Sequence, residues 1–291
     1  MIQKLRTRFV EKVWGVSRLP PLFGHSFQKP IGEVWFEPTR DLDQLLAKYI
    51  FASERLSVQA HPTNEQARAL GLGNTGKSEC WVITHAEPGA RIAAGFREKI
   101  SAEHMQAAAL DGSIIDLLDW HEVYPGDAFY IPGGTVHAIG GGVSLIEVQQ
   151  NNDITFRLFD YGRPRELHLD RGVEIADTAP YPSSLRSRID GDAGQLVDGP
   201  HFDLFYWRCS GEAPFPGLAD HPALFIPFSG TVAIGKEDLA VGECAVVHGP
   251  RSDMLHGDAL LLIAQPRRCP APGAGLLILR STVTLSRQAA S

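Results

Sequence analysis

One histidine in this 291-residue sequence follows an unusual turn and is the first candidate for chemistry. Gly126 is followed by five strand-like residues, then by Pro132, Gly134 and, three positions later, His137. Proline and glycine together bend the backbone sharply, which would aim the imidazole back between the strands. Imidazole is a common metal ligand. On its own, His137 could equally be a structural, hydrogen-bonded residue, so the ligand interpretation requires partners elsewhere in the chain.

Polar side chains recur on one face of several other strand-like runs. Because side chains alternate between the two faces of a strand, residues two positions apart share a face. Such pairs are Gln59 with His61, Lys77 with Glu79, Glu147 with Gln149, and Thr155 with Arg157. A buried charged side chain is costly unless it is paired or ligates something. We therefore expect a metal with charged neighbours inside a barrel of strands.

The turn around His137 resembles the second motif of the cupins, small jelly-roll barrels that hold a metal between strands. The match is incomplete, because Gly141 stands where the common motif has an asparagine. The glycines 140–142 would leave space beside the imidazole for a substrate, or they serve only as a turn.

The first 165 residues also contain six stretches, in matching order and spacing, that resemble the type I phosphomannose isomerases of the cupin superfamily, in their short bacterial form. The stretches are VWG at 13–15, GEVWFE at 32–37, LSVQAHP at 56–62, GKSECWVI at 76–83, PGDAFYIPGGTVHAIGGG at 125–142 and IEVQQNNDITFRLFDYGR at 146–163.

The resemblance implies one divalent metal, most commonly zinc. Its ligands would be Gln59, His61, Glu79 and His137. Two imidazoles and two oxygen ligands suit zinc and would also accept manganese, cobalt, nickel or ferrous iron. The Gln-x-His pair replaces the His-x-His of common cupins, which counts against a three-histidine oxygenase site.

The resemblance further implies the interconversion of mannose 6-phosphate and fructose 6-phosphate through an enediol. The implied catalytic residues are Arg157, Glu147 and Lys77. Arg157 would stabilise either the developing oxyanion or the substrate phosphate, and Lys77 could stabilise whichever of these two groups Arg157 does not. The base could be Glu147, Lys77 or a metal-bound water. The alternatives without a catalytic role are that Glu147 is a solvated strand residue and that Arg157 forms a surface ion pair with Asp153 or Asp160.

Two other functions remain open at this stage. A non-catalytic cupin that only binds a sugar would share the metal ligands, but it would have no need of Lys77, Glu147 and Arg157 together. An isomerase of a related free or phosphorylated aldose would keep all of them.

The wider sequence predicts a mainly β fold of two tandem jelly-roll (cupin) barrels with a short helical insertion. Residues 1–175 would form the catalytic metal-binding domain, with helix near 100–123 that is interrupted at Gly112. The Pro- and Ser-rich stretch at 176–194 suggests a linker between the two domains. Residues 195–291 would form a degenerate cupin without a metal. Two further short helices are expected at 41–50 and 64–70.

Composition limits the remaining classes. The chain is 44% hydrophobic and 21% charged, with a net charge of −7, which favours a globular protein and argues against nucleic acid as a partner. No apolar window is long enough for a membrane span, and no secretory signal is evident, so a cytoplasmic location is expected. The four cysteines are far apart, which predicts reduced thiols. The expected partner is a small phosphosugar, and the expected state is a monomer or homodimer.

Overall fold

The computed structural model describes residues 2–24, 26–216, 221–249 and 254–267. In this part of the chain the structure is mainly β, with nineteen strands, four α-helices and two short 3-10 helices (Pro21–Phe23 and Ser183–Leu185), in agreement with the expected class. The chain divides into two compact units. One comprises Thr7–Glu37 and Gln44–Arg188, and the other comprises Met1–Arg6, Pro38–Asp43 and Ile189–Ser291.

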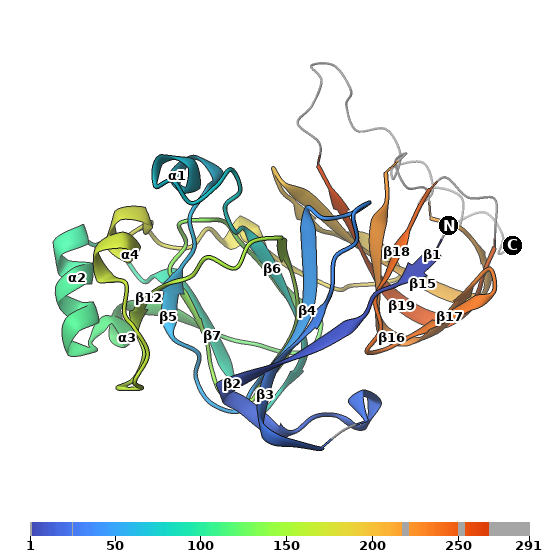
Figure 1. Ribbon diagram of the computed structural model, residues 1–291, viewed down its shortest axis with the longest axis horizontal. Coiled ribbons are helices and arrows are strands. Elements are labelled where there is room, and N and C mark those ends of the chain that lie inside the picture. The colour runs from blue at the N-terminus through green and yellow to red at the C-terminus, as the bar shows by residue number, and fades with distance from the viewer. Residues whose placement is uncertain (1, 25, 217–220, 250–253, 268–291) are drawn as a thin grey trace, which may run out of the picture. The chain divides into compact units, whose positions relative to one another are not determined.

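The first unit contains two antiparallel sheets (Figure 1). The five-stranded sheet has the order β12 (Phe156–Phe159), β5 (Val58–Ala60), β10 (His137–Ile139), β7 (Arg91–Phe96) and β8 (Leu118–Glu122). The seven-stranded sheet has the order β13 (Arg186–Arg188), β9 (Asp127–Ile131), β6 (Glu79–Ala86), β11 (Val143–Gln150), β4 (Leu45–Ala52), β3 (Ser26–Phe36) and β2 (Thr7–Arg18).

The two sheets of this unit face each other across a shared hydrophobic core. Ile92 and Ile139 of the five-stranded sheet belong to the same buried cluster as Trp81, Phe129 and Leu145 of the seven-stranded sheet. Apolar side chains between facing sheets are removed from water on both sides, at about 25 cal/mol per Å² of buried area. The polar residues that share this interior are therefore exceptional, and they mark the candidate site.

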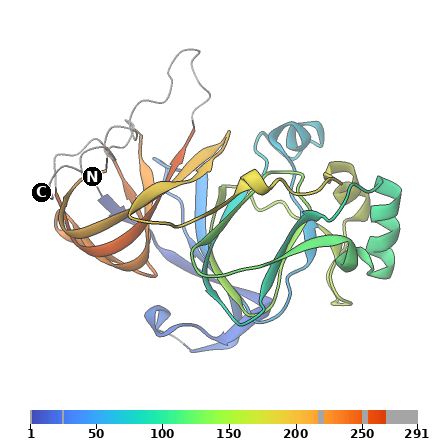
Figure 2. The same cartoon turned by 180° about the vertical axis from the view of Figure 1, so that it is seen from behind.

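Four helices accompany the five-stranded sheet (Figures 1 and 2). They are α1 (Asn64–Ala69), α2 (Ala102–Asp111), α3 (Ile114–Leu117) and α4 (Leu169–Ile175). Met105, Ile114 and Ile175 from α2, α3 and α4 pack with Ala93 and Ala138 of the sheet. The five-stranded sheet therefore has one face toward the other sheet and one face toward α2, α3 and α4.

The second unit has one antiparallel sheet in its described residues. Its strand order is β1 (Ile2–Lys4), β18 (Ala245–Val247), β16 (Ala223–Ile234), β19 (Met254–Pro266), β15 (Phe202–Pro214) and β14 (Ala193–Asp198), and β17 (Glu237–Ala240) pairs with β16. Phe225, Val232 and Leu261 are fully buried in its own core.

The helices confirm two predictions and correct a third. In α1, Thr63 and Gln66 form a reciprocal capping box, and α2 begins at the predicted cap Ser101 and ends at Gly112, whose φ is 88°. The expected helix near 100–123, however, ends at Leu117. Residues 118–122 instead form β8, because Trp120 pairs with Ala93 at the edge of the five-stranded sheet.

The prediction of a helix at 41–50 is wrong. Leu45–Ala52 form β4, and all eight residues are buried. A strand that is buried on both faces gives a continuous apolar run without the alternation that identifies a half-buried strand, so the run LLAKYIFA can be mistaken for a buried helix.

The cysteines agree with the predicted reduced state where they are described. Cys80, Cys209 and Cys244 are buried free thiols, and Cys269 lies outside the described residues. Among the described helices, none has the length and apolar character required to cross a bilayer.

Candidate metal centre and active site

The strand register places the predicted ligands between the two sheets. His137 of β10 lies directly opposite Gln59 of β5, and Arg157 of β12 lies opposite Gln59 on its other side. Val58 and Ala60 pack with the helices instead. Because side chains alternate, Gln59 and His137 face the interior. The prediction that Gln59 and His61 share a face is confirmed, since both lie beside His137 in the interior.

The glycine turn before β10 fixes the position of His137. Gly134 has a φ of 93°, a conformation that side chains disfavour, and its N–H donates to the carbonyl of His61 at 2.7 Å. A Cβ on Gly133 would lie 2.7 Å from the carbonyl oxygen of Pro62. The turn therefore packs directly against the backbone at His61 and Pro62, and this contact fixes the position of His137 relative to His61.

Three buried side chains converge at this point. Ligand atoms of His61, Glu79 and His137 all lie within 4.8 Å of one another. The two Glu79 oxygens lie 3.4 Å from Nε2 of His61 and 3.6 Å from Nε2 of His137. In the part of the chain that the structure describes, this is the one grouping of histidine, cysteine and acidic residues that could hold a metal ion.

Both imidazoles are oriented by backbone carbonyls. Nδ1 of His61 lies 2.8 Å from the carbonyl oxygen of Ile154, and Nδ1 of His137 lies 2.9 Å from that of Thr135. A carbonyl can only accept, so each Nδ1 carries the proton and each Nε2 presents its lone pair to the cluster. Burial, followed by the ammonium of Lys77, lowers the pKa of His61 well below its ordinary value, and burial lowers the pKa of His137. Both rings are thus in the neutral form that binds metals.

Gln59 lies beside the cluster and could supply a fourth ligand. Its Nε2 is 3.3 Å from Nε2 of His137, and its Oε1 accepts a hydrogen bond from Ser57 Oγ at 3.0 Å. A half-turn of the amide would direct Oε1 toward the cluster, and the Ser57 hydroxyl can accept from the amide as readily as it donates. The donor set then comprises two imidazole nitrogens and two oxygens, which fits zinc.

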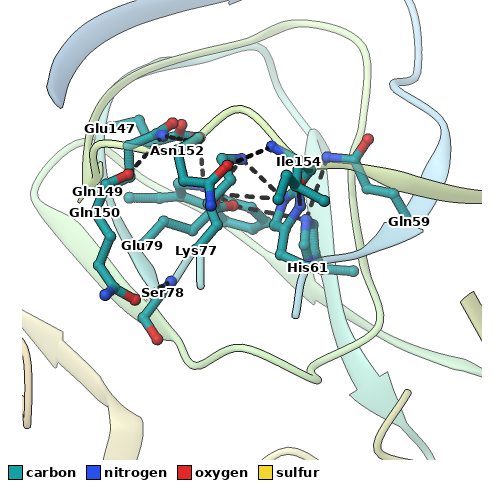
Figure 3. Close-up of polar contacts among 12 residues, drawn as sticks. Gln59, His61, Lys77, Ser78, Glu79, Glu147, Gln149, Gln150, Asn152 and Ile154 are labelled. Carbon is teal, nitrogen blue, oxygen red and sulfur yellow. Dashed lines mark hydrogen bonds and ion pairs between the residues drawn. The ribbon is translucent and has the colours of Figure 1, made fainter. Parts of the chain in front are cut away.

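Lys77 contacts two of the three clustered residues directly. Its Nζ lies 2.9 Å from Nε2 of His61 and 2.7 Å from Oε2 of Glu79, and Figure 3 shows the three side chains pointing toward one another. Burial alone would raise the pKa of Glu79, but Lys77 and the two imidazoles lower it below its usual range. Glu79 is therefore ionised, as a metal ligand must be.

Glu147 is buried beside Glu79, which excludes the solvated-strand alternative. Its Oε1 lies 2.8 Å from Nζ of Lys48, and its Oε2 accepts from the indole N–H of Trp81 at 3.0 Å. The same indole N–H also contacts Oε1 of Glu79 at 3.0 Å. Burial and then the charge of Glu79 raise the pKa of Glu147, against the opposing effect of Lys48. Trp81 thus links the clustered carboxylate to Glu147.

Arg157 is half-buried at the open side of this pocket. Its hydrogen-bonding side-chain contact is Nη1 with the carbonyl of Glu166 at 3.3 Å, and its buried Nε has no partner. Among the described residues, no ion pair includes Arg157, because Asp160 is held by Arg163 and Arg165. The alternative of a surface pair with Asp160 or Asp153 therefore finds no support in the geometry.

The pocket holds residues that sequence reasoning missed. Its walls include Lys12, Glu33, Lys48 and Arg165 in addition to the predicted residues. Nζ of Lys12 lies 3.2 Å from Glu33, and Trp35 Nε1 donates to Glu33 at 2.6 Å. The signal that could have revealed Lys48 is a lone lysine within the apolar run LLAKYIFA.

The enclosed part of the pocket is small, at about 50 Å³. That is room for an ion with a few waters, since a cavity of roughly 10–15 Å³ already holds one water. A ligand larger than an ion would therefore extend outward along Asp153, Thr155, Arg157 and Arg165, which are among the more exposed residues of the wall.

The idea that glycines 140–142 form the substrate mouth is not supported. Gly140 and Gly141 line a different hollow, together with Arg55 and Trp120. A Cβ on Gly141 would lie 2.9 Å from the carbonyl oxygen of Ser53, and one on Gly140 would lie 2.4 Å from that of Arg91. Close backbone packing accounts for these glycines.

Sequence comparison with known proteins decides the family. No family model matches the chain. YvyI of Bacillus subtilis, whose name assigns it to the mannose-6-phosphate isomerases, is 30% identical over 250 residues, which cover 70% of this chain and 78% of that protein. The chain belongs to the mannose-6-phosphate isomerase family. The mannose-6-phosphate isomerase of Streptococcus mutans is 28% identical over 317 residues, covering 91% of this chain and 98% of that protein.

Solved structures of mannose-6-phosphate isomerases agree with this assignment. The enzyme from Bacillus subtilis is 25% identical in sequence and has a TM-score of 0.77, and the aligned region covers 90% of this chain and 98% of the Bacillus chain. A zinc-bound mannose 6-phosphate isomerase, 15% identical, matches in fold with a TM-score of 0.69 over 92% of this chain and 100% of its own. The family resemblance read from the motifs is confirmed.

Proposed function

We propose that this protein is a metal-dependent aldose–ketose isomerase that interconverts mannose 6-phosphate and fructose 6-phosphate. The observation that carries the proposal is the buried cluster of His61, Glu79 and His137, with both Nε2 lone pairs facing one carboxylate. Arg157 lies in the wall of the same pocket, and its buried Nε has no hydrogen-bond partner. Family membership supports the substrate.

The ligands that we propose are Gln59, His61, Glu79 and His137, for one divalent ion that is most consistent with zinc. The donor set and the zinc-bound relative of the same fold support this choice. Such an ion would act as a Lewis acid on the C1 and C2 oxygens of the sugar.

The chain's own residues supply the remaining chemistry. Isomerisation moves a proton between C2 and C1 through an enediol, so a base must take the proton from one carbon and return it to the other. Glu147, Lys77 and a metal-bound water are the candidates, and both side chains line the pocket and are buried. Arg157 would hold the phosphate or the developing oxyanion with its unpaired N–H groups.

We also propose that each unit is a cupin-type jelly roll, the first catalytic and the second without a metal. The two facing sheets of the first unit and the fold of the solved isomerases support the jelly-roll assignment. The candidate ligands among the described residues all lie in the first unit. The cytoplasmic location expected from the sequence stays a prediction, which cell fractionation would test.

A coupled assay tests the proposed activity. The zinc-loaded protein should convert mannose 6-phosphate but not mannose, because the free sugar offers no phosphate to Arg157. Metal binding without turnover of either sugar would indicate a sugar-binding module. Comparable turnover of free mannose or another aldose would indicate a related isomerase.

Solvent exchange separates the three candidate bases. Run in deuterium oxide with the wild type, the reaction should place deuterium on the sugar carbon that receives the proton. Of Glu147→Gln and Lys77→Met, the variant that abolishes both turnover and exchange while keeping the metal identifies the base, and exchange that persists in both variants indicates the metal-bound water.

A further inference from the structure

A second hollow lies in the same unit, apart from the candidate metal centre. Its volume is about 340 Å³, and its walls share no residue with those of the metal pocket. Small-molecule sites are typically clefts of roughly 300–1,000 Å³. The hollow is thus large enough for a small metabolite, and the mechanism proposed above does not use it.

The hollow lies on the helix-covered side of the five-stranded sheet. Arg91 shares a face of β7 with Ala93, which packs with the helices, whereas Ala94 on the opposite face pairs in register with His137. Ile115 and Trp120 complete the wall from α3 and β8. The sheet itself therefore separates this hollow from the residues that would bind the metal.

The charges of the wall are predominantly positive. Arg55, Arg91 and Arg97 line it and Asp116 is its one acidic member, so three positive charges face one negative charge. This occurs in a protein with a net charge of −7. Concentrated positive charge on an acidic protein must be balanced by solvent ions or by an anionic ligand.

The three guanidinium groups are available. Among the described residues, no ion pair includes Arg55, Arg91 or Arg97, although acidic residues occur nearby. Glu122, the register partner of Arg91, accepts a hydrogen bond from Tyr124 Oη at 2.7 Å instead. By contrast, Arg163 next to this region is fully engaged with Glu54 and Asp160.

The scaffold that carries these arginines is fixed by backbone hydrogen bonds. The carbonyl of Arg91 accepts from Gly140 at 2.8 Å, and the N–H of Arg97 donates to Leu117 at 3.0 Å. Trp120 Nε1 donates to the carbonyl of Ile115 at 2.9 Å, and the Arg55 guanidinium lies 5.9 Å from the centre of the Trp120 ring. Exposed guanidinium groups on a hydrogen-bonded frame are suited to capturing a tetrahedral anion by paired N–H donation.

We propose that this hollow is a second anion site, which binds the phosphate group of a small phosphorylated metabolite. The ligand chemistry is a phosphate that contacts Arg91 and Arg97, with Arg55 and Trp120 beside the remainder of the molecule. The site is independent of the isomerase chemistry.

Equilibrium dialysis of the zinc-loaded full chain with radiolabelled orthophosphate tests the proposal. The wild type should bind two phosphates per chain. Arg91→Gln/Arg97→Gln should bind one, with the lost site weakened at least tenfold, and Arg157→Ala should lose the other. Arg18→Gln/Lys99→Gln is the matched control, because it also removes two exposed positive charges outside both pockets, and it should bind two.

Retention of two phosphates by Arg91→Gln/Arg97→Gln would overturn the proposal, as would a wild type whose only phosphate is lost in Arg157→Ala. Arg91 and Arg97 are exposed, so the melting temperature and the isomerase activity of Arg91→Gln/Arg97→Gln should match the wild type. A second arm with fructose 6-phosphate on Arg157→Ala identifies the source of the phosphate. Tighter binding than orthophosphate indicates a phosphosugar, and equal binding indicates free phosphate.

Discussion

The imidazoles of His61 and His137 are prepared for a metal by the backbone rather than by other side chains. The carbonyls of Ile154 and Thr135 fix both tautomers, so neither ring must move its proton between nitrogens before Nε2 can bind an ion. The carbonyl of Ile154 belongs to the same loop that leads into Arg157. One short segment therefore orients a ligand and positions the candidate cation.

The first prediction concerns the metal ligands. Wild-type protein should hold about one zinc per chain by elemental analysis, and His137→Ala should reduce the content severalfold. Loss of a group that only hydrogen-bonds to a metal ligand typically costs about 10–100-fold in metal affinity, and loss of a direct ligand costs more. The control His104→Ala changes an exposed histidine on α2 and should leave the metal content intact. Two ions per chain, or full zinc content in His137→Ala, would contradict the ligand set.

The second prediction concerns Arg157. Arg157→Ala should lower kcat/KM by about two to four orders of magnitude, or ~3–5 kcal/mol of transition-state stabilisation, because the substrate phosphate or oxyanion loses its cation. Zinc content and the circular dichroism spectrum should not change. Arg171→Ala, which removes an exposed arginine on α4, is the control and should keep normal kinetics. Activity near the wild-type level in Arg157→Ala would show that the cation lies elsewhere.

At the level of secondary-structure elements, the β4–β11 pairing brings together the buried charges. Lys48 and Glu147 are register partners, and their side chains form an ion pair in which each is almost completely buried. Burial alone would lower the pKa of Lys48, but Glu147 and Glu33 offset it and raise the pKa above its ordinary value. The charged forms are thus held by each other and not by water.

A third prediction follows for this strand pair. Lys48→Met should reduce the free energy of unfolding by about 3–5 kcal/mol, because it leaves Glu147 buried without its counter-charge. Lys48→Met/Glu147→Leu should recover most of that loss, since an apolar pair of similar volume has no charge to desolvate. Urea denaturation monitored by circular dichroism measures both. Equal destabilisation of the single and the double variant would mean that the ion pair is not what Lys48 contributes.

The fourth prediction concerns the turn between β9 and β10. Gly133→Ala should weaken zinc binding about tenfold or more, because its Cβ would press on the carbonyl of Pro62 and displace the turn that carries His137. Gly71→Ala is the control, since Gly71 has a positive φ but open space around it. It should cost about 1 kcal/mol of stability and leave zinc affinity unchanged. Normal zinc affinity in Gly133→Ala would show that the turn adjusts freely.

At the level of the whole molecule, a negatively charged protein must bind a negatively charged substrate. With a net charge of −7, long-range attraction cannot concentrate a phosphosugar at the surface. Capture therefore depends on local cations such as Arg157 and Arg165 in the wall of the metal pocket.

The fifth prediction concerns metal removal. Chelation should lower the melting temperature, because a ligand present at about 1,000 times its Kd stabilises the folded state by about 4 kcal/mol. Four of the five tryptophans, Trp14, Trp35, Trp81 and Trp120, lie in the unit with the metal centre, and Trp207 lies in the other. Fluorescence of the Trp207→Phe variant should therefore report the lower melting temperature of the unit with the metal centre, and readdition of zinc should restore the original melting temperature. An unchanged melting temperature after verified zinc removal would exclude a structural contribution from the ion.

The sequence by itself determined the features that depend on neighbouring residues. The turn that ends at Gly134, the capped helices at 64–69 and 102–111, and the shared face of Gln59 and His61 follow from local backbone chemistry and from alternation along a strand. The family motifs added the ligand set, which the geometry brings together at His61, Glu79 and His137.

Only the tertiary structure decided which residues of different strands lie opposite each other. Lys48 faces Glu147 because of a register between segments about a hundred positions apart, and the indole N–H of Trp81 is shared by two carboxylates from different strands. Burial of β4 on both faces removed the alternation that would have identified it as a strand. Gly140 and Gly141 lie near His137 in sequence but line a different hollow, because a strand carries successive residues about 3.3 Å further along and to alternate faces.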